Sequence, residues 1–244
     1  MDFSQTLIRA SSVGHLMTEP VAKADKEAGV LSNSAQRHLI EVYIAEKYGR
    51  KKEVQTKQMK KGNEVEEEAI KFLANYLGKN FSKNTVRLDN EYIAGTPDII
   101  ELQESGITIY DVKSSYDLWS FLNNIPDKLD SIYYWQMQSY MFLTGADKAY
   151  VAYCLLSTPF EIIMQEQKSL LYKMNVVSEE NPEYIKEAEK IELNMTFEDI
   201  DPSERILLYS VDRNDDEIEK IKSKVLKART FLQELEQTHL KFNK

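Results

Sequence analysis

The chain has 244 residues, of which 42% are hydrophobic and 29% charged, and its formal net charge is −9. This composition is typical of a folded globular protein, and no apolar run approaches the roughly 20 residues that a membrane-spanning helix needs. The single cysteine, Cys154, excludes an internal disulfide and a multi-cysteine zinc or iron–sulfur site. The N-terminal residues also lack the apolar centre of a signal peptide, so we expect a cytoplasmic protein without membrane contact.

The charge is distributed unevenly along the chain. Residues 47–61 contain seven Lys or Arg and one Glu, whereas residues 178–217 contain fourteen acidic and four basic residues. The overall negative charge argues against a nucleic-acid partner, but this separation is compatible with a groove that binds a polyanion. A solvated helix face followed by a charged loop would produce the same pattern.

The N-terminal part of the chain is predicted to be helical. Apolar spacing and capping residues predict a short helix within residues 6–18 and a second helix from Asn33 or Ser34 to about Tyr48. A third helix is predicted from Val54 to Leu77, and Gly78 ends it.

The pattern then changes to strands and returns to helices. Strands are predicted at 83–89, 91–102, 107–114, 149–156 and 205–211, and helices at 130–144 and 214–240. The last helix carries an apolar seam that can pack on the body of the protein or on another chain. We expect an α/β fold with a central mixed β-sheet flanked by helices. It forms one domain over 1–244, with a helical C-terminal extension over 156–244.

Three charged residues fall on the predicted hairpin at 91–114. Asp111 and Lys113 are two apart in a strand, so their side chains point to the same face, while Val112 points to the other. Asp98 lies on the partner strand, directly after Pro97. Two neighbouring carboxylates repel each other unless a cation lies between them, and hard oxygen ligands suit Mg²⁺ or Mn²⁺. A lysine beside such an ion can orient water or stabilise a phosphate.

Each of these features also has an ordinary structural explanation. An Asp-x-Lys pair on an exposed strand is common, and Gly-Thr-Pro-Asp before a strand is often only a turn. The three histidines show no ligand spacing. Only the combination on one hairpin favours a site.

The same residues resemble a known signature. Pro97-Asp98, followed by twelve residues and then Asp111-Val112-Lys113, is similar to the motif of the PD-(D/E)XK nucleases, and within them to the phage lambda-type exonuclease and viral recombinase group. The resemblance covers residues 9–155 and includes a Gly-x-x-x-Glu-x-x-Ala helix from Gly62 to Ala69 and a Gln-x-Gln segment with a Gln-x-x-x-Tyr pattern at 136–140.

The resemblance assigns roles to individual residues. Asp98, Asp111, Glu66 and the Val112 carbonyl would bind the metal, and Lys113, Gln136 and Tyr140 would complete the catalytic set. Gln136 and Tyr140 share a helix face because they are four residues apart, and Gln138 points elsewhere, although the family's Gln-x-Gln leaves Gln138 open as a DNA contact. Other predicted DNA or phosphate contacts are Arg9, Ser11, Ser12, Thr96 and the lysines Lys51, Lys52, Lys57, Lys60 and Lys61.

The resemblance implies an enzyme that degrades duplex DNA from its ends in phage-type recombination. It also implies a single-strand annealing recombinase as partner and a homo-oligomer, a trimer. Two alternatives stay open: an endonuclease with the same core, and a non-catalytic DNA-binding protein of this fold. A nuclease of the CRISPR-adaptation type is excluded, because one cysteine cannot hold its iron–sulfur cluster.

Overall fold

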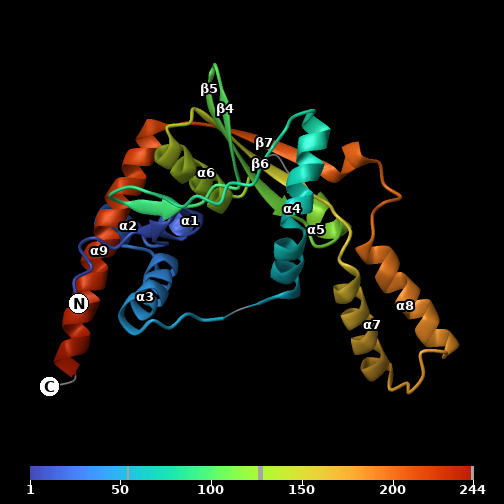
Figure 1. Ribbon diagram of the computed structural model, residues 1–244. Coiled ribbons are helices and arrows are strands. Elements are labelled where there is room, and N and C mark those ends of the chain that lie inside the picture. The colour runs from blue at the N-terminus through green and yellow to red at the C-terminus, as the bar shows by residue number, and fades with distance from the viewer. Residues whose placement is uncertain (54, 126–128, 243–244) are drawn as a thin grey trace.

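A computed structural model describes residues 1–53, 55–125 and 129–242. A four-stranded sheet lies at the centre (Figure 1). Its inner strands β5 and β6 run parallel, while the edge strands β4 and β7 are antiparallel to their neighbours. The predicted α/β class with a mixed central sheet is therefore confirmed. In spatial order the strands are β4 (Ile99–Gln103), β5 (Gly106–Ser114), β6 (Lys148–Cys154) and β7 (Ile206–Asp212).

Helices cover both faces of this sheet. α4 (Lys57–Leu77) packs on the face that carries Val112 of β5. α6 (Ser131–Thr144) packs on the opposite face, which carries Ile109. β5 is thus buried on both sides, a position in which strands are normally apolar throughout. Charged side chains on this strand therefore need a specific reason to be there.

The two covering helices end where the sequence predicts. Gly78 follows α4 and Gly145 follows α6, with φ of 62° and 73°, a left-handed conformation that glycine adopts without strain. α4 begins after Thr56, whose hydroxyl accepts a hydrogen bond from the backbone N–H of Met59. Val54, the predicted start of this helix, lies outside the described residues.

The predicted strand at 91–102 is in fact two strands in different sheets. The break falls at Thr96-Pro97-Asp98, because proline has no N–H to donate to a ladder. The break places Asp98 at the junction of the two sheets. The predicted strand at 83–89 is reduced to its last two residues. The smaller sheet contains, in spatial order, β1 (Ile8–Arg9), β3 (Ile93–Gly95) and β2 (Leu88–Asp89).

The C-terminal helix packs on the N-terminal part of its own chain. The seam of α9 (Asp215–Phe242), including Val225 and Leu232, is buried against residues such as Leu39 and Leu16. This contact decides the question that the sequence left open. The N-terminal helices on which it packs are α1 (Val13–Leu16) and α3 (Asn33–Tyr48). The N-terminal part also contains the short η1 (Ala10–Ser12) and α2 (Lys23–Glu27).

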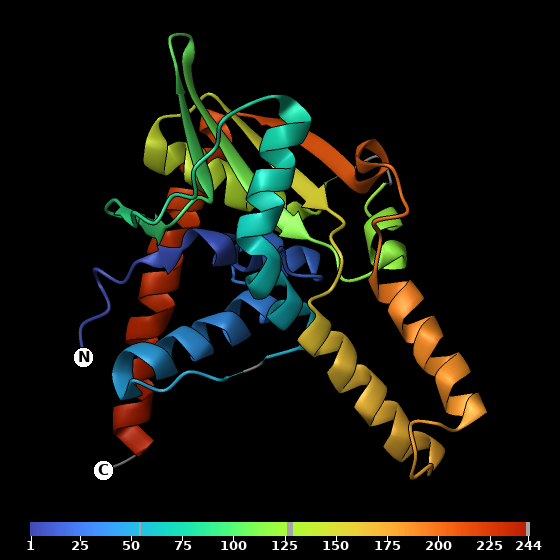
Figure 2. The same cartoon turned by 45° about the vertical axis from the view of Figure 1, so that its right-hand side comes forward.

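Two helices that the sequence did not predict form a hairpin beside the sheet. α7 (Phe160–Met174) and α8 (Pro182–Met195) lie side by side and extend away from the body (Figures 1 and 2). α5 (Leu118–Leu122) and the short η2 (Pro202–Arg205) complete the fold. Among the described helices, none has the length and apolarity to span a membrane.

Candidate active site

The α6 face of β5 holds an acid and a lysine side by side. Lys113 Nζ lies 2.6 Å from Asp111 Oδ2, so the two side chains share one face as strand geometry requires. The Asp111 side chain is only 1% exposed. Although burial lowers the pKa of Lys113, the negative charge of Asp111 raises it above its usual range, and the lysine stays charged.

Asp98 joins this pair from the adjacent strand. It lies one step beyond the Ile99–Tyr110 pair of the β4–β5 ladder, which places it opposite Asp111. Its Oδ2 accepts a hydrogen bond of 2.8 Å from the Val112 N–H. Burial, and then the charge of Asp111, raise the pKa of Asp98 to about 7. The Val112 N–H and the charge of Lys113 lower this pKa, but they do not cancel the effect of burial and of the neighbouring Asp111.

The donor set fits a hard divalent cation. Asp111 Oδ2 is buried, and among the described residues its partner is the ammonium group of Lys113, at 2.6 Å. The Val112 carbonyl points to the same edge as its N–H, towards Asp98, because the two groups of a strand residue face one neighbour. Carboxylate and carbonyl oxygens are the ligands that Mg²⁺ and Mn²⁺ prefer.

Glu66 lies at the margin of this group. Its Oε2 is 2.7 Å from Lys83 Nζ, a partner that the sequence reading missed. Glu66 is the weakest of the groups that raise the pKa of Asp98. Within the described residues no cluster of three His, Cys, Asp or Glu is arranged to hold a metal ion. The structure thus brings Asp98 and Asp111 together and leaves Glu66 bound to a lysine nearby.

α6 supplies the polar support of the buried acid. Gln136 Nε2 donates to Asp111 Oδ1 at 3.0 Å and to the Tyr140 hydroxyl at 3.1 Å. Both side chains are buried, and burial raises the pKa of Tyr140 to about 12. The four-residue spacing therefore places both on the face that meets β5, as the sequence indicates.

Gln138 has a different role from the one predicted. It is fully buried, its Nε2 donates to the Asp212 carbonyl at 2.8 Å, and its Oε1 accepts from the Asn214 N–H at 3.0 Å. Both ends of its amide therefore hold the turn between β7 and α9. The predicted DNA contact of Gln138 is wrong, because its polar atoms are used inside the protein.

The predicted phosphate-binding segment lies next to Tyr140. A Cβ atom placed on Gly95 would come within 2.7 Å of Ala10 Cβ and 2.8 Å of Tyr140 Cε1, so η1, β3 and α6 meet closely there. Around this contact Arg9, Ser11 and Thr96 are exposed and Ser12 is half-buried. The structure thus brings the N-terminal segment to the same edge as the glutamine–tyrosine pair.

The predicted lysine contacts differ in their exposure and in their partners. Lys51 and Lys52 are exposed in the segment before α4, and Lys57 is exposed but forms an ion pair with Glu166 of α7. Lys60 is half-buried and donates to Gln165.

Lys61 cannot contact DNA, because it is fully buried. Its Nζ donates to the Tyr116 carbonyl at 2.8 Å and lies 5.2 Å from the centre of the Phe197 ring. Burial lowers its pKa to about 8. The burial of Lys61 could have been predicted from the sequence, because Lys61 lies one helical turn before Val65, on the apolar face of α4.

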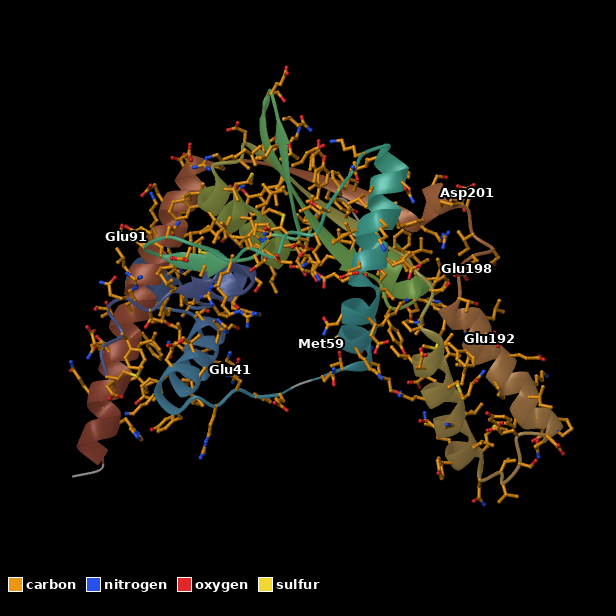
Figure 3. All side chains as sticks on the ribbon, in the orientation of Figure 1. Glu41, Met59, Glu91, Glu192, Glu198 and Asp201 are labelled. Atoms are coloured by element: carbon orange, nitrogen blue, oxygen red, sulfur yellow. The ribbon has the colours of Figure 1, made fainter. Side chains whose placement is uncertain are left out.

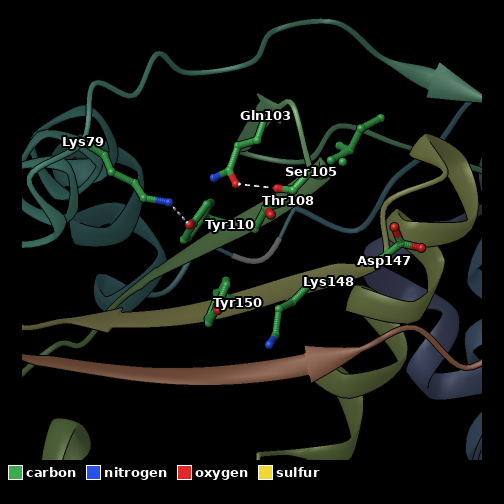
Figure 4. A pocket seen from close by; sticks show the side chains of 10 residues that line it. Lys79, Gln103, Ser105, Thr108, Tyr110, Asp147, Lys148 and Tyr150 are labelled. Carbon is green, nitrogen blue, oxygen red and sulfur yellow. Dashed lines mark hydrogen bonds between the residues drawn. The ribbon is translucent and has the colours of Figure 1, made fainter.

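Neither the acidic residues near α8 nor the cavity beside β4 and β5 lies at the group of Asp98, Asp111 and Lys113. Glu192, Glu198 and Asp201 lie on the α8 side of the molecule, opposite the N-terminal helix that carries Glu41 (Figure 3). An open cavity of about 330 Å³ lies beside the β4–β5 hairpin (Figure 4). Residues such as Lys79, Tyr110 and Tyr150 line it, and none of the predicted site residues does.

A comparison of the whole chain with protein families agrees with this arrangement of two acids and a lysine. A profile of the PD-(D/E)XK nuclease superfamily matches residues 5–243. The chain belongs to this superfamily. PD-(D/E)XK nucleases generally use divalent metal ions, in agreement with the donor set described above. Among curated proteins no match was found.

Solved structures of similar fold cover nearly the whole length of this PD-(D/E)XK chain. A phage-related exonuclease from Haemophilus somnus 129PT has 29% sequence identity and a TM-score of 0.76, over 96% of this chain and 97% of that one. An alkaline exonuclease (LHK-Exo) from Laribacter hongkongensis shares the fold at 15% identity and a TM-score of 0.63, over 98% and 96%. That exonuclease has also been solved in complex with dAMP.

Proposed function

We propose that this PD-(D/E)XK protein is a Mg²⁺- or Mn²⁺-dependent deoxyribonuclease that hydrolyses phosphodiester bonds from the ends of duplex DNA. One observation carries the proposal. Asp98 and Asp111 are held opposite each other, with the ammonium group of Lys113 2.6 Å from Asp111 Oδ2. A purely structural ion pair does not require the second carboxylate.

Each residue then has a defined task. Asp98, Asp111 and the Val112 carbonyl hold the ion, which when bound polarises the scissile phosphate and lowers the pKa of water. Lys113 orients the attacking water and stabilises the charge that develops on the phosphate oxygens. Gln136 and Tyr140 keep the Asp111 carboxylate in place. Glu66 binds or orients a second ion or its water.

The contacts to DNA surround this centre. Arg9, Ser11, Ser12 and Thr96 receive a terminal phosphate, because guanidinium and short hydroxyl groups are good phosphate partners. Lys51, Lys52 and Lys57 contact the DNA backbone, which makes binding depend on salt. Lys57 has to exchange its ion pair with Glu166 for a phosphate to do so.

The exonuclease assignment and its context come from relatives. The 29% identity with a phage-related exonuclease over nearly the full length favours action at DNA ends and a role in phage-type recombination. We further propose a single domain over 1–244, a cytoplasmic location, a homo-oligomer such as a trimer, and a single-strand annealing recombinase as partner.

End-labelled linear duplex DNA, with and without a 5′ phosphate, tests this function in Mg²⁺, Mn²⁺ and EDTA. We expect degradation that needs the ion and leaves covalently closed circular DNA intact. Cutting of the closed circle supports the endonuclease alternative. Activity that is absent in every ion supports the non-catalytic DNA-binding alternative and overturns the proposal. Lys148→Ala, which removes a half-buried lysine of the same sheet that pairs with Asp212, is the control for Lys113→Ala.

A further inference from the structure

Lys113 has a second contact besides Asp111. Its Nζ lies 4.9 Å from the centre of the Tyr133 ring, within the range of a cation–π interaction. We propose that Tyr133 is a positioning residue that holds the Lys113 ammonium in its working place. This inference rests on the proposed function and deepens it, because it adds a residue that acts through Lys113.

The Tyr133 ring is itself held in place. It lies three residues before Gln136 on α6, so both side chains face β5 and reach Lys113 and Asp111 respectively. The ring meets Tyr153 edge-on, with centroids 6.0 Å apart and planes at 73°. Tyr153 is the direct neighbour of Lys113 in the β5–β6 ladder. The lysine is therefore bounded by aromatic rings from a helix and from the next strand.

A further ring extends this support across the sheet. Tyr153 packs edge-on against Tyr209 of β7, with centroids 5.9 Å apart, and the Tyr209 hydroxyl donates to the Asn124 carbonyl. Tyr153 is 5% exposed, so this row cannot rearrange without disturbing the core. A ring anchored in this way restricts the rotamers of a long, flexible lysine before substrate arrives.

The tyrosine is needed because the other partner of Lys113 has two tasks. Asp111 Oδ2 is the oxygen closest to Lys113, at 2.6 Å, and in the proposed function the same carboxylate also binds the cation. When a cation also binds this carboxylate, the attraction between Asp111 and Lys113 weakens, because the cation and the ammonium group compete for the same negative charge. The face of the Tyr133 ring is not shared, and it keeps the ammonium beside the acids.

Three variants of the full chain test this role. Tyr133→Leu removes the ring, Tyr133→Phe keeps it, and Tyr134→Leu removes a half-buried tyrosine of the same helix whose ring packs on Trp135 instead. We expect Tyr133→Leu to lower kcat about tenfold with KM for duplex DNA little changed, because a partly desolvated cation–π contact is of that size. Tyr133→Phe and Tyr134→Leu should keep the wild-type kcat.

A second measurement does not depend on activity. In metal-free protein with ¹³C-labelled lysine, the methylene protons beside the Lys113 ammonium should show an upfield ring-current shift in wild type and Tyr133→Phe. Tyr133→Leu should lose the shift and some thermal stability, no more than Tyr134→Leu loses, whereas its stabilisation by Mn²⁺ should stay close to wild type. Lys113→Ala assigns the resonance.

The outcomes separate the inference from the function on which it rests. If wild type degrades DNA and Tyr133→Leu has the same kcat, or if the ring-current shift survives in that variant, the positioning role is wrong and the nuclease stands. A parallel loss of kcat in Tyr133→Phe would also overturn the role, because the hydroxyl rather than the ring would then be required. If wild type cleaves no DNA in any ion, both fall.

Discussion

Lys113 at the acidic pair is half-buried, Lys61 between α4 and the loop after β5 is fully buried, and the surroundings of these two lysines differ. Lys113 faces a buried carboxylate at 2.6 Å, which raises its pKa. Lys61 faces the Tyr116 carbonyl and two aromatic rings, and burial lowers its pKa to about 8. The comparison shows that burial alone does not fix the direction in which the pKa of a lysine shifts. The position of the nearest anion decides the charge and its use.

The largest effect is expected at the lysine with the carboxylate partner. Lys113→Ala should lower kcat by a factor on the order of 10³, because it removes the group that stabilises charge on the transferred phosphate. Binding of duplex DNA should change little. Turnover assays and fluorescence anisotropy with a labelled duplex measure the two quantities. Equal losses of kcat and affinity would show that Lys113 only binds DNA.

The other lysine should affect stability instead of turnover. The folded pKa of Lys61, about 8, lies below its value of 10.5 in the unfolded chain, so the unfolded chain binds more protons between these pH values. The free energy of unfolding should therefore rise with pH across this window, by up to about 3 kcal/mol. Lys61→Met should remove this rise, because the cost of burying the charge disappears.

Urea unfolding of wild type and Lys61→Met at pH 7, 8, 9 and 10 measures this effect. Subtracting the two curves removes the contribution of all other titrating groups. Lys52→Met, at an exposed position, is the control and should follow wild type. A constant difference between wild type and Lys61→Met across the window would contradict the buried, poorly compensated charge.

Asp98, the acid opposite Asp111, should make metal binding depend on pH. The pKa of Asp98 is raised to about 7, so a cation must displace a proton below that pH. The apparent affinity for Mn²⁺ should rise about tenfold per pH unit towards pH 7 and level off above it. Calorimetric titration from pH 5.5 to 8 measures this slope. Asp98→Asn should flatten the slope, and a steep slope in that variant would assign the proton to another group.

Gln136 and Gln138 on α6 allow the same comparison between a site residue and a structural residue, with a smaller expected effect. Gln138→Leu leaves the Asp212 carbonyl and the Asn214 N–H without their partner, which should cost about 1–3 kcal/mol of stability with kcat retained. Gln136→Leu should instead lower kcat, because it frees the carboxylate of Asp111. Thermal unfolding together with turnover assays on both variants tests this, and a reversed pattern would refute the assignment.

The local part of the candidate site could be predicted from the sequence. The two-residue period of a strand is enough to place Asp111 and Lys113 on one face, and the four-residue spacing on a helix pairs Gln136 with Tyr140. Gly78 and Gly145 likewise predict the ends of α4 and α6. These features depend only on backbone periodicity and on residues near in the chain.

Other features required contacts between distant segments. The sequence did not predict the hairpin of α7 and α8, because charged residues dominate both segments. Their small apolar cluster of Ile162, Ile163 and Met195 forms only when the two helices pack together. The pairing of Glu66 with Lys83 joins a helix to a segment without regular structure, and no spacing rule predicts it.

By itself the sequence determined the mixed α/β order of elements from its hydrophobic patterns. It also determined that Asp111 and Lys113 share one face and that Gln136 pairs with Tyr140, because each of these pairs follows from the geometry of one strand or helix. Only the tertiary structure decided that Pro97 divides one strand between two sheets, that Lys61 and Gln138 are structural, and that Tyr133 lies over Lys113. Burial and the nearest partner of a polar group depend on which distant segments pack together, and a local pattern does not contain that information.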